Sequence, residues 1–145
     1  MMGYAVEDVS VLVVEDDEID AIAIKRALFD EGLGNQVVHV VDGIEALECL
    51  RGQNGREKLC EPLFVLLDIN MPRMNGHEFL SELSGDPALD DTVVFVLTTS
   101  DDQRDREAVY EKYADGYILK ADLAGDYSTL ASMLKNYWAM VAPPS

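Results

Sequence analysis

The stretch FVLLDINMPRMNG, residues 64–76, decides the fold class. Four apolar residues run directly into the carboxylate of Asp68, and a proline and a glycine follow soon after it. A short, continuously apolar run is typical of a strand that is covered on both faces, as in a parallel sheet. A buried strand that ends on an acid and passes into a loop indicates a functional site rather than a core.

Four further runs of the same kind predict four more strands. They comprise residues 11–14, 37–41, 93–97 and, more weakly, 117–119. Helical patterns with apolar residues three or four positions apart separate the runs, and the clearest of them follows the last run. Five strands that alternate with five helices predict a doubly wound α/β domain, in which a five-stranded parallel sheet carries helices on both faces.

The composition of the chain excludes several classes of protein. Its 145 residues, 48% of them hydrophobic, suit one domain over 1–145. The excess of 28 acidic over 11 basic residues repels a phosphate backbone, so direct nucleic-acid binding is not expected. No apolar run approaches the ~20 residues that cross a bilayer, and a signal peptide is not recognisable. These features predict a cytoplasmic protein without a membrane partner.

Polar side chains follow the apolar runs at the carboxyl ends of the predicted strands, where ligands bind in this architecture. They are Glu15, Asp16 and Asp17 after the first run, Asp68 after the third, Thr98 to Ser100 after the fourth and Lys120 after the fifth. Carboxylates about 4 Å apart repel by roughly 4 kcal/mol per pair at an effective dielectric near 20, so this edge requires a counter-charge. Mg2+, which prefers oxygen ligands, and the lysine could supply it.

A carboxylate in such a place can act as a nucleophile toward phosphorus. When Mg2+ and a lysine neutralise the transferring phosphoryl oxygens, Asp68 could form an aspartyl phosphate. Glu15 and Asp16 would then hold the metal, while Lys120 and a threonine hydroxyl would meet the phosphoryl oxygens. The acids after the first run could instead merely cap the helix that follows them.

Five motifs occur in the order and spacing of the receiver domains of bacterial two-component response regulators, which the chain resembles over nearly its whole length. The motifs are VLVVEDDE, VVHVVDGIEALECL, VLLDINMPRMNGHEFL, VVFVLTTSDD and DGYILKAD. The resemblance implies a flavodoxin-like receiver fold without an output domain. It also implies that the protein catalyses its own phosphoryl transfer and dephosphorylation through Asp68.

The resemblance assigns a role to each residue of the site. Glu15 and Asp16 match the acid pair, with Asp16 as the direct Mg2+ ligand, and Asn70 matches the position whose backbone carbonyl binds the metal. The others are Asp68 as phosphoacceptor, Thr98 as the hydroxyl that moves toward the phosphoryl group, Tyr117 as the switch aromatic and Lys120 as the family lysine. Ala121 departs from the family pattern, which usually has a proline there.

The segment LTTSDD, the lysine without a following proline and the tail NYWAMVAPP resemble, more narrowly, stand-alone receivers that partner phytochrome-type histidine kinases. This resemblance implies a sensor histidine kinase, of the bacteriophytochrome class, as the phosphoryl donor. Tyr137 and Trp138 are expected in the core or at the rim of the last helix, and they could also form a contact between two copies of the chain.

Two other functions stay open. A receiver-like scaffold could bind partners without being phosphorylated, but a scaffold has no need of mutually repelling acids. A hydrolase could use Asp68 as its nucleophile, but it would want a second acid two residues later as proton donor, and residue 70 is Asn. His39 and His77 have no partner at catalytic spacing and are expected to be structural.

Overall fold

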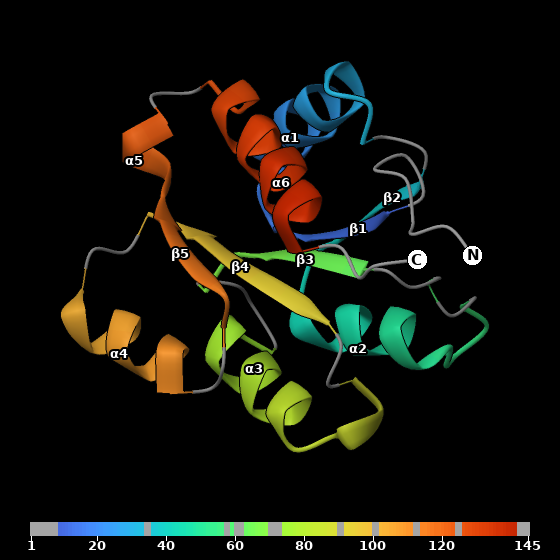
Figure 1. Cartoon of the computed structure of the whole chain (residues 1–145). Helices are drawn as coiled ribbons and strands as arrows, with labels where there is room; N and C mark the ends of the chain where they lie inside the picture. The colour runs from blue at the N-terminus through green and yellow to red at the C-terminus, as the bar shows by residue number, and fades with distance from the viewer. Residues whose placement is uncertain are drawn as a thin grey trace.

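The sheet at the centre of the molecule has five parallel strands in the order β2-β1-β3-β4-β5 (Figure 1). A computed structural model of the chain describes residues 9–33, 36–56, 59, 63–69, 74–89, 92–99, 102–111, 114–123 and 126–141, with the side chains of the last segment up to residue 137. The strands are β1 (Ser10–Val14), β2 (Gln36–Val40), β3 (Leu63–Leu67), β4 (Val93–Thr98) and β5 (Gly116–Leu119). The predicted parallel sheet is therefore confirmed.

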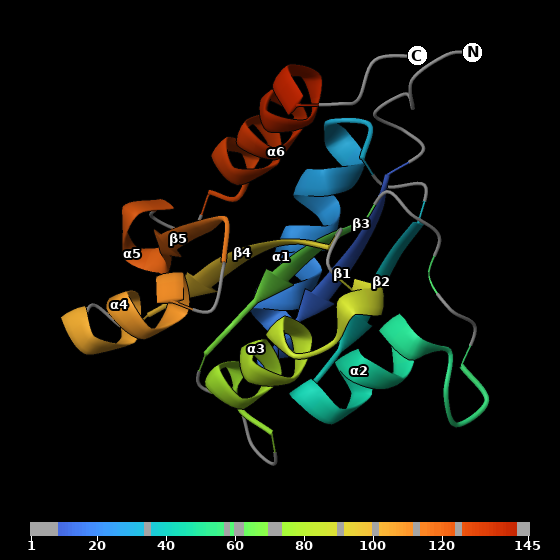
Figure 2. The same cartoon turned by 60° about the horizontal axis from the view of Figure 1, so that its bottom comes forward.

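Helices cover both faces of this sheet. They are α1 (Glu18–Asp30), α2 (Gly43–Arg51), α3 (Gly76–Ser84), α4 (Gln103–Glu111), α5 (Lys120–Leu123) and α6 (Ser128–Val141), with a 3-10 turn at Pro87–Leu89. Helices α1 and α6 lie on one face and α2 and α3 on the other (Figures 1 and 2). The doubly wound class is confirmed, with one difference: α5, a helix of four residues that begins directly after β5, was not predicted.

The strands are continuously apolar because each face of the sheet has its own core. Side chains of β1 alternate between the two: Leu12 and Val14 pack in the core beneath α2 and α3, whereas Val11 and Val13 pack in the core beneath α1 and α6. In the second core the ring of Tyr137 meets Phe64 and Phe95 edge-on, with centroids 6.0 and 5.1 Å away. Tyr137 is thus a half-buried residue packed against this core, which agrees with its expected place in the core or at the rim of the last helix.

The strand register brings the expected site residues to one edge. Val14 pairs with Leu67, so the acids that follow β1 lie beside Asp68, which follows β3. Thr98 at the end of β4 pairs with Leu119, the residue before Lys120. Because all strands are parallel, their carboxyl ends share this edge.

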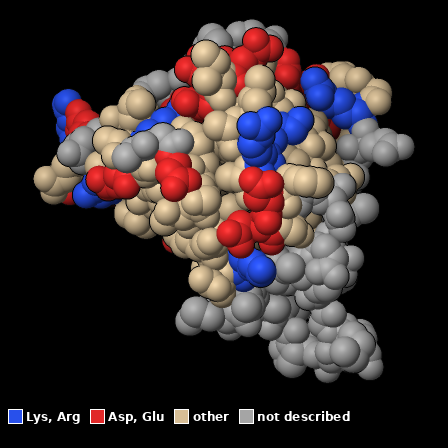
Figure 3. All heavy atoms as spheres, turned by 90° about the horizontal axis from the view of Figure 1, so that it is seen from above, with Lys and Arg blue, Asp and Glu red and all other residues tan. Residues whose placement is uncertain are grey.

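Basic and acidic side chains are intermixed on one face of the molecule (Figure 3). On the face that carries α1 and α6, the lysine and arginine side chains lie dispersed among acidic ones instead of forming one basic patch (Figure 3). That face therefore offers no concentrated positive field for a phosphate backbone. Within the described residues, each helix is too short or too polar to cross a membrane.

Candidate functional site

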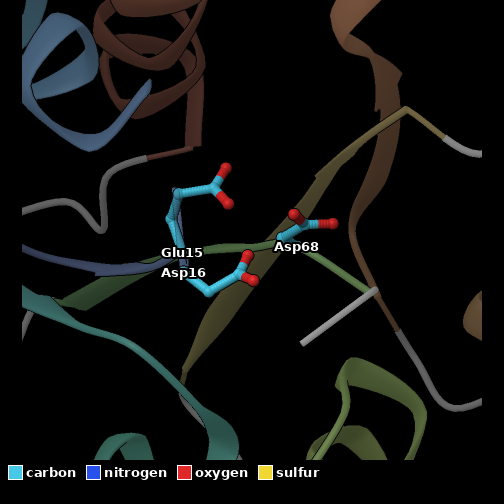
Figure 4. A group of neighbouring side chains, drawn as sticks. All are labelled: Glu15, Asp16 and Asp68. Atoms are coloured by element: carbon cyan, nitrogen blue, oxygen red, sulfur yellow. The ribbon is translucent and has the colours of Figure 1, made fainter. Parts of the chain in front are cut away.

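Three carboxylates converge at the carboxyl edge of the sheet. Glu15 and Asp16 extend from the end of β1 and Asp68 from the end of β3, and their side chains point into a common space (Figure 4). One oxygen of each lies within 4.8 Å of the others. Glu15 and Asp68 are buried, at 2% and 8% exposure, whereas Asp16 is open to solvent. This set of hard oxygen donors, with one accessible side, fits a divalent cation of the Mg2+ and Mn2+ type.

The neighbouring acid Asp17 has a different role. Its Oδ1 accepts hydrogen bonds from the backbone amides of Ile19 (2.9 Å) and Asp20 (3.2 Å), which makes it the N-cap of α1. The helix-capping alternative is therefore right for Asp17. Glu15 and Asp16, which precede the cap, remain available to the cluster.

Lys120 provides the counter-charge. Its ammonium donates hydrogen bonds to Glu15 Oε1 and, at 2.8 Å, to Asp20 Oδ2, and it lies 3.6 Å from Asp68 Oδ2. Its side chain is only 11% exposed. Burial by itself lowers the pKa of Lys120, but the hydrogen bonds to Asp20 and Glu15 and the nearby charges outweigh burial and raise it. Lys120 is therefore firmly protonated and positively charged beside the acids.

Glu15, the most deeply buried of the three clustered acids, is a strong base for a carboxylate. Burial, together with the hydrogen bond and the charge of Asp68, raises the pKa of Glu15 to about 8, although the hydrogen bond and charge of Lys120 act in the opposite direction. Without a metal, Glu15 therefore retains its proton over much of the neutral range. Its backbone is held in place by His39, whose Nε2–H donates to the Glu15 carbonyl oxygen (2.6 Å). A structural role for His39 agrees with this contact.

A glycine closes the far end of the loop that follows Asp68. The backbone amide of Gly76 donates to the Ile69 carbonyl oxygen at 2.9 Å. A Cβ atom on residue 76 would lie 2.7 Å from Ile69 Cα and 2.9 Å from the Asp68 carbonyl oxygen. Only glycine allows the start of α3 to approach the backbone of the nucleophile candidate so closely.

We expect Gly76→Ala to slow phosphorylation of the protein about tenfold, because the clash must displace the backbone that orients Asp68. It should also lower the free energy of unfolding by ~1–3 kcal/mol through overpacking. Phosphorylation rates and denaturant unfolding would measure both effects. Gly85→Ala is the matched control, since a Cβ there lies 3.5 Å from its nearest neighbour. Equal rates in the two variants would contradict this role of Gly76.

The structure describes two of the other expected site residues, and two lie outside its described part. Thr98 is fully buried at the end of β4. The Tyr117 ring in β5 is half-buried, with the guanidinium carbon of Arg106 on α4 5.2 Å from its centroid. Asn70 and the side chain of Trp138 lie outside the described residues, so their expected roles stay predictions.

The sequence pattern missed Asp20. Its carboxylate touches Lys120, although the two residues are 100 positions apart. One signal could have found it: Asp20, Ile24 and Ala27 lie four and then three positions apart, so Asp20 continues the buried stripe of α1 toward the edge of the sheet.

Comparison with known proteins identifies the family. The profile of the response regulator receiver domain matches residues 11–126. Response regulator Rcp1 of Synechocystis sp. is 30% identical over 128 residues, which make up 88% of this chain and 87% of that protein. The phosphorylated cyanobacterial phytochrome response regulator RcpA has a TM-score of 0.82 at 30% identity, over 93% of this chain and 96% of that one. The Mn2+-bound form of Rcp1 has a TM-score of 0.80 at 28% identity, over 94% and 98%.

The chain therefore belongs to the receiver-domain family of two-component response regulators. Its function is that of a receiver in two-component signalling, as the sequence motifs predicted.

Proposed function

We propose that the protein accepts a phosphoryl group on Asp68. One observation carries this proposal: a buried carboxylate lies beside two further acids, with a lysine ammonium 3.6 Å from its Oδ2. In the reaction an Asp68 oxygen attacks phosphorus, the bond from phosphorus to the donor breaks, and the leaving group takes the electron pair. Lys120 offsets the negative charge on the phosphoryl oxygens, because its ammonium already faces Asp68.

The metal would be Mg2+, held by Asp16, Asp68 and Glu15 and by the backbone carbonyl at Asn70. When bound, Mg2+ neutralises charge on the phosphoryl oxygens. The exposed side of the cluster at Asp16 leaves room for the waters that Mg2+ retains. Dephosphorylation proceeds at the same site, where water attacks phosphorus and the Asp68 carboxylate leaves.

Mg2+ affinity is expected to rise with pH, by up to about tenfold per unit below pH ~8, because the cation must displace the proton of Glu15. The same raised pKa makes the metal-free protein less stable as pH increases toward 8, since the folded state binds more protons than the unfolded state in that range. Titration of Mg2+ or Mn2+ from pH 6 to 9 measures the first effect. Glu15→Gln should make Mg2+ affinity nearly independent of pH in this range. An unchanged pH dependence in that variant would show that it does not come from the proton of Glu15.

Phosphorylation would change the surface through two residues. Thr98, buried at the carboxyl end of β4, would turn its hydroxyl toward the phosphoryl group, and Tyr117 would rotate inward. Tyr117 packs against the core while its ring contacts Arg106 on α4. A rotation of Tyr117 would break that contact and alter the surface of α4 and β5 that partners meet.

The phosphoryl donor would be a sensor histidine kinase of the phytochrome class. The similarity to RcpA, a phytochrome response regulator, and to Rcp1 supports this choice of partner. The chain would act as a single receiver domain, which its 87% coverage of Rcp1 supports. Two copies could associate through α6 at Tyr137 and Trp138, although the contacts of Tyr137 with Phe64 and Phe95 leave only part of its ring for a partner.

Incubation with a small acyl phosphate and Mg2+ tests the proposal. The mass of the intact protein should rise by one phosphoryl group, and EDTA should prevent the rise. A protein that never gains the group would be a phosphorylation-independent scaffold instead. Continuous turnover of many phosphomonoesters would identify a hydrolase.

A further inference from the structure

Asp20 contacts the site without belonging to the carboxylate cluster. It lies in the first turn of α1, with a side chain that is 30% exposed. Its Oδ2 accepts a hydrogen bond of 2.8 Å from Lys120, shorter than the 3.6 Å from the same ammonium to Asp68. Among the described residues, the cluster that could hold a cation comprises Glu15, Asp16 and Asp68.

The ammonium of Lys120 needs hydrogen-bond acceptors that hold it at the site. Lys120 follows β5 and is the first residue of the short helix α5. The backbone therefore fixes the position of its Cα atom but not that of the ammonium at the end of a long, flexible side chain. Within the described part of the chain, the ammonium of Lys120 donates hydrogen bonds to Glu15 and Asp20. Glu15 would share its oxygens with a bound cation, whereas Asp20 stands outside the cluster. The contact with Asp20 can therefore persist whether or not a cation is bound.

Asp20 also interacts with Tyr127. Tyr127, the residue before α6, is buried at 7% exposure. Burial raises the pKa of Tyr127 to about 12, and the charge of Asp20 contributes to the rise. Asp20 thus bonds to Lys120 and lies close enough to Tyr127 to affect the pKa of that residue.

We propose that Asp20 is a positioning residue for phosphoryl transfer at Asp68: its carboxylate holds the Lys120 ammonium at the rim of the acid cluster before the phosphoryl group arrives. This inference rests on the proposed function and adds to it a carboxylate with no place among the metal ligands. Asp20 acts through Lys120, and its effect falls on the rate of transfer rather than on binding of the donor.

Two matched variants test the inference. Asp20→Asn removes the charge but keeps the size of the side chain, and Glu18→Gln removes the charge of an exposed acid in the same helical turn. Both changes remove a negative charge from the first turn of α1 and weaken its interaction with the helix dipole alike. Only Asp20→Asn alters a side chain that is hydrogen-bonded to Lys120. Asp20→Asn should lower the maximal phosphorylation rate with a small acyl phosphate about tenfold, with the half-saturating donor concentration nearly unchanged. Asp20→Glu should recover part of the rate.

The NMR signal of the Lys120 ammonium provides a second readout. Its slow hydrogen exchange, expected in the wild type, should become fast in Asp20→Asn and stay slow in Glu18→Gln. If Asp20→Asn phosphorylates as fast as Glu18→Gln, or faster, the inference is overturned while the proposed function stands. If the wild type itself takes up no phosphoryl group, both are overturned.

Discussion

An Asp68→Asn protein is expected to take up no phosphoryl group from a small acyl phosphate under conditions that saturate the wild type. The amide lacks the anionic carboxylate oxygen that attacks phosphorus, so the rate should fall by at least ~1,000-fold, as for loss of a catalytic nucleophile. Intact-mass spectrometry over time measures the loss. Because the charge of Asp68 helps to raise the pKa of Glu15, the same change should lower that pKa.

Asp30→Asn is the control for this experiment, since Asp30 is exposed at the end of α1. It removes the same charge from the chain without touching the acid cluster. Uptake should then match the wild type. Persistent stoichiometric phosphorylation of Asp68→Asn would show that another residue is the acceptor.

Lys120→Met is expected to slow phosphorylation on the order of 100-fold or more, because it removes the positive group that faces the attacking carboxylate. Methionine keeps an unbranched stem of similar length, so the loss isolates the charge. Glu15, deprived of its hydrogen-bonded counter-ion, should become harder to ionise, and its pKa should rise further. Measured rates and the pH dependence of metal binding report the two effects.

Lys135 provides the comparison for Lys120→Met. It is exposed on α6, so Lys135→Met makes the same chemical change away from the site. Its phosphorylation rate should equal that of the wild type. A Lys120→Met rate close to that of Lys135→Met would mean that the ammonium has no part in the transfer.

The sheet edge was predictable because parallel strands leave a local mark in the sequence. Each strand must be apolar on both faces, and the first residue beyond it lies at the carboxyl edge. Each of Asp68 and Lys120 is recognisable from the short apolar run that precedes it. Because both follow strands of one parallel sheet, the sequence predicts that they lie near each other although they are far apart in the chain. The structure places the Lys120 ammonium 3.6 Å from Asp68 Oδ2.

Features that depend on packing between distant elements were not predictable. The contact of Asp20 with Lys120 joins residues 100 positions apart, and the stripe of α1 that indicates the buried side of Asp20 does not indicate its partner. Helix α5 has four residues and is too short for a periodic pattern. The burial that raises the pKa of Glu15 is equally hidden, because Glu15 stands in a run of acids that resembles a solvated helix start.

The most direct test of the central claim is to identify the residue that carries the phosphoryl group. Borohydride reduces an acyl phosphate to an alcohol, so a phosphorylated aspartate becomes homoserine, which peptide mass spectrometry can locate. After treatment with a small acyl phosphate and Mg2+, homoserine should be found at residue 68, and EDTA should abolish it. Homoserine at another aspartate, or a phosphoryl group on a histidine, serine or threonine with residue 68 unmodified, would contradict capture of the phosphoryl group by Asp68.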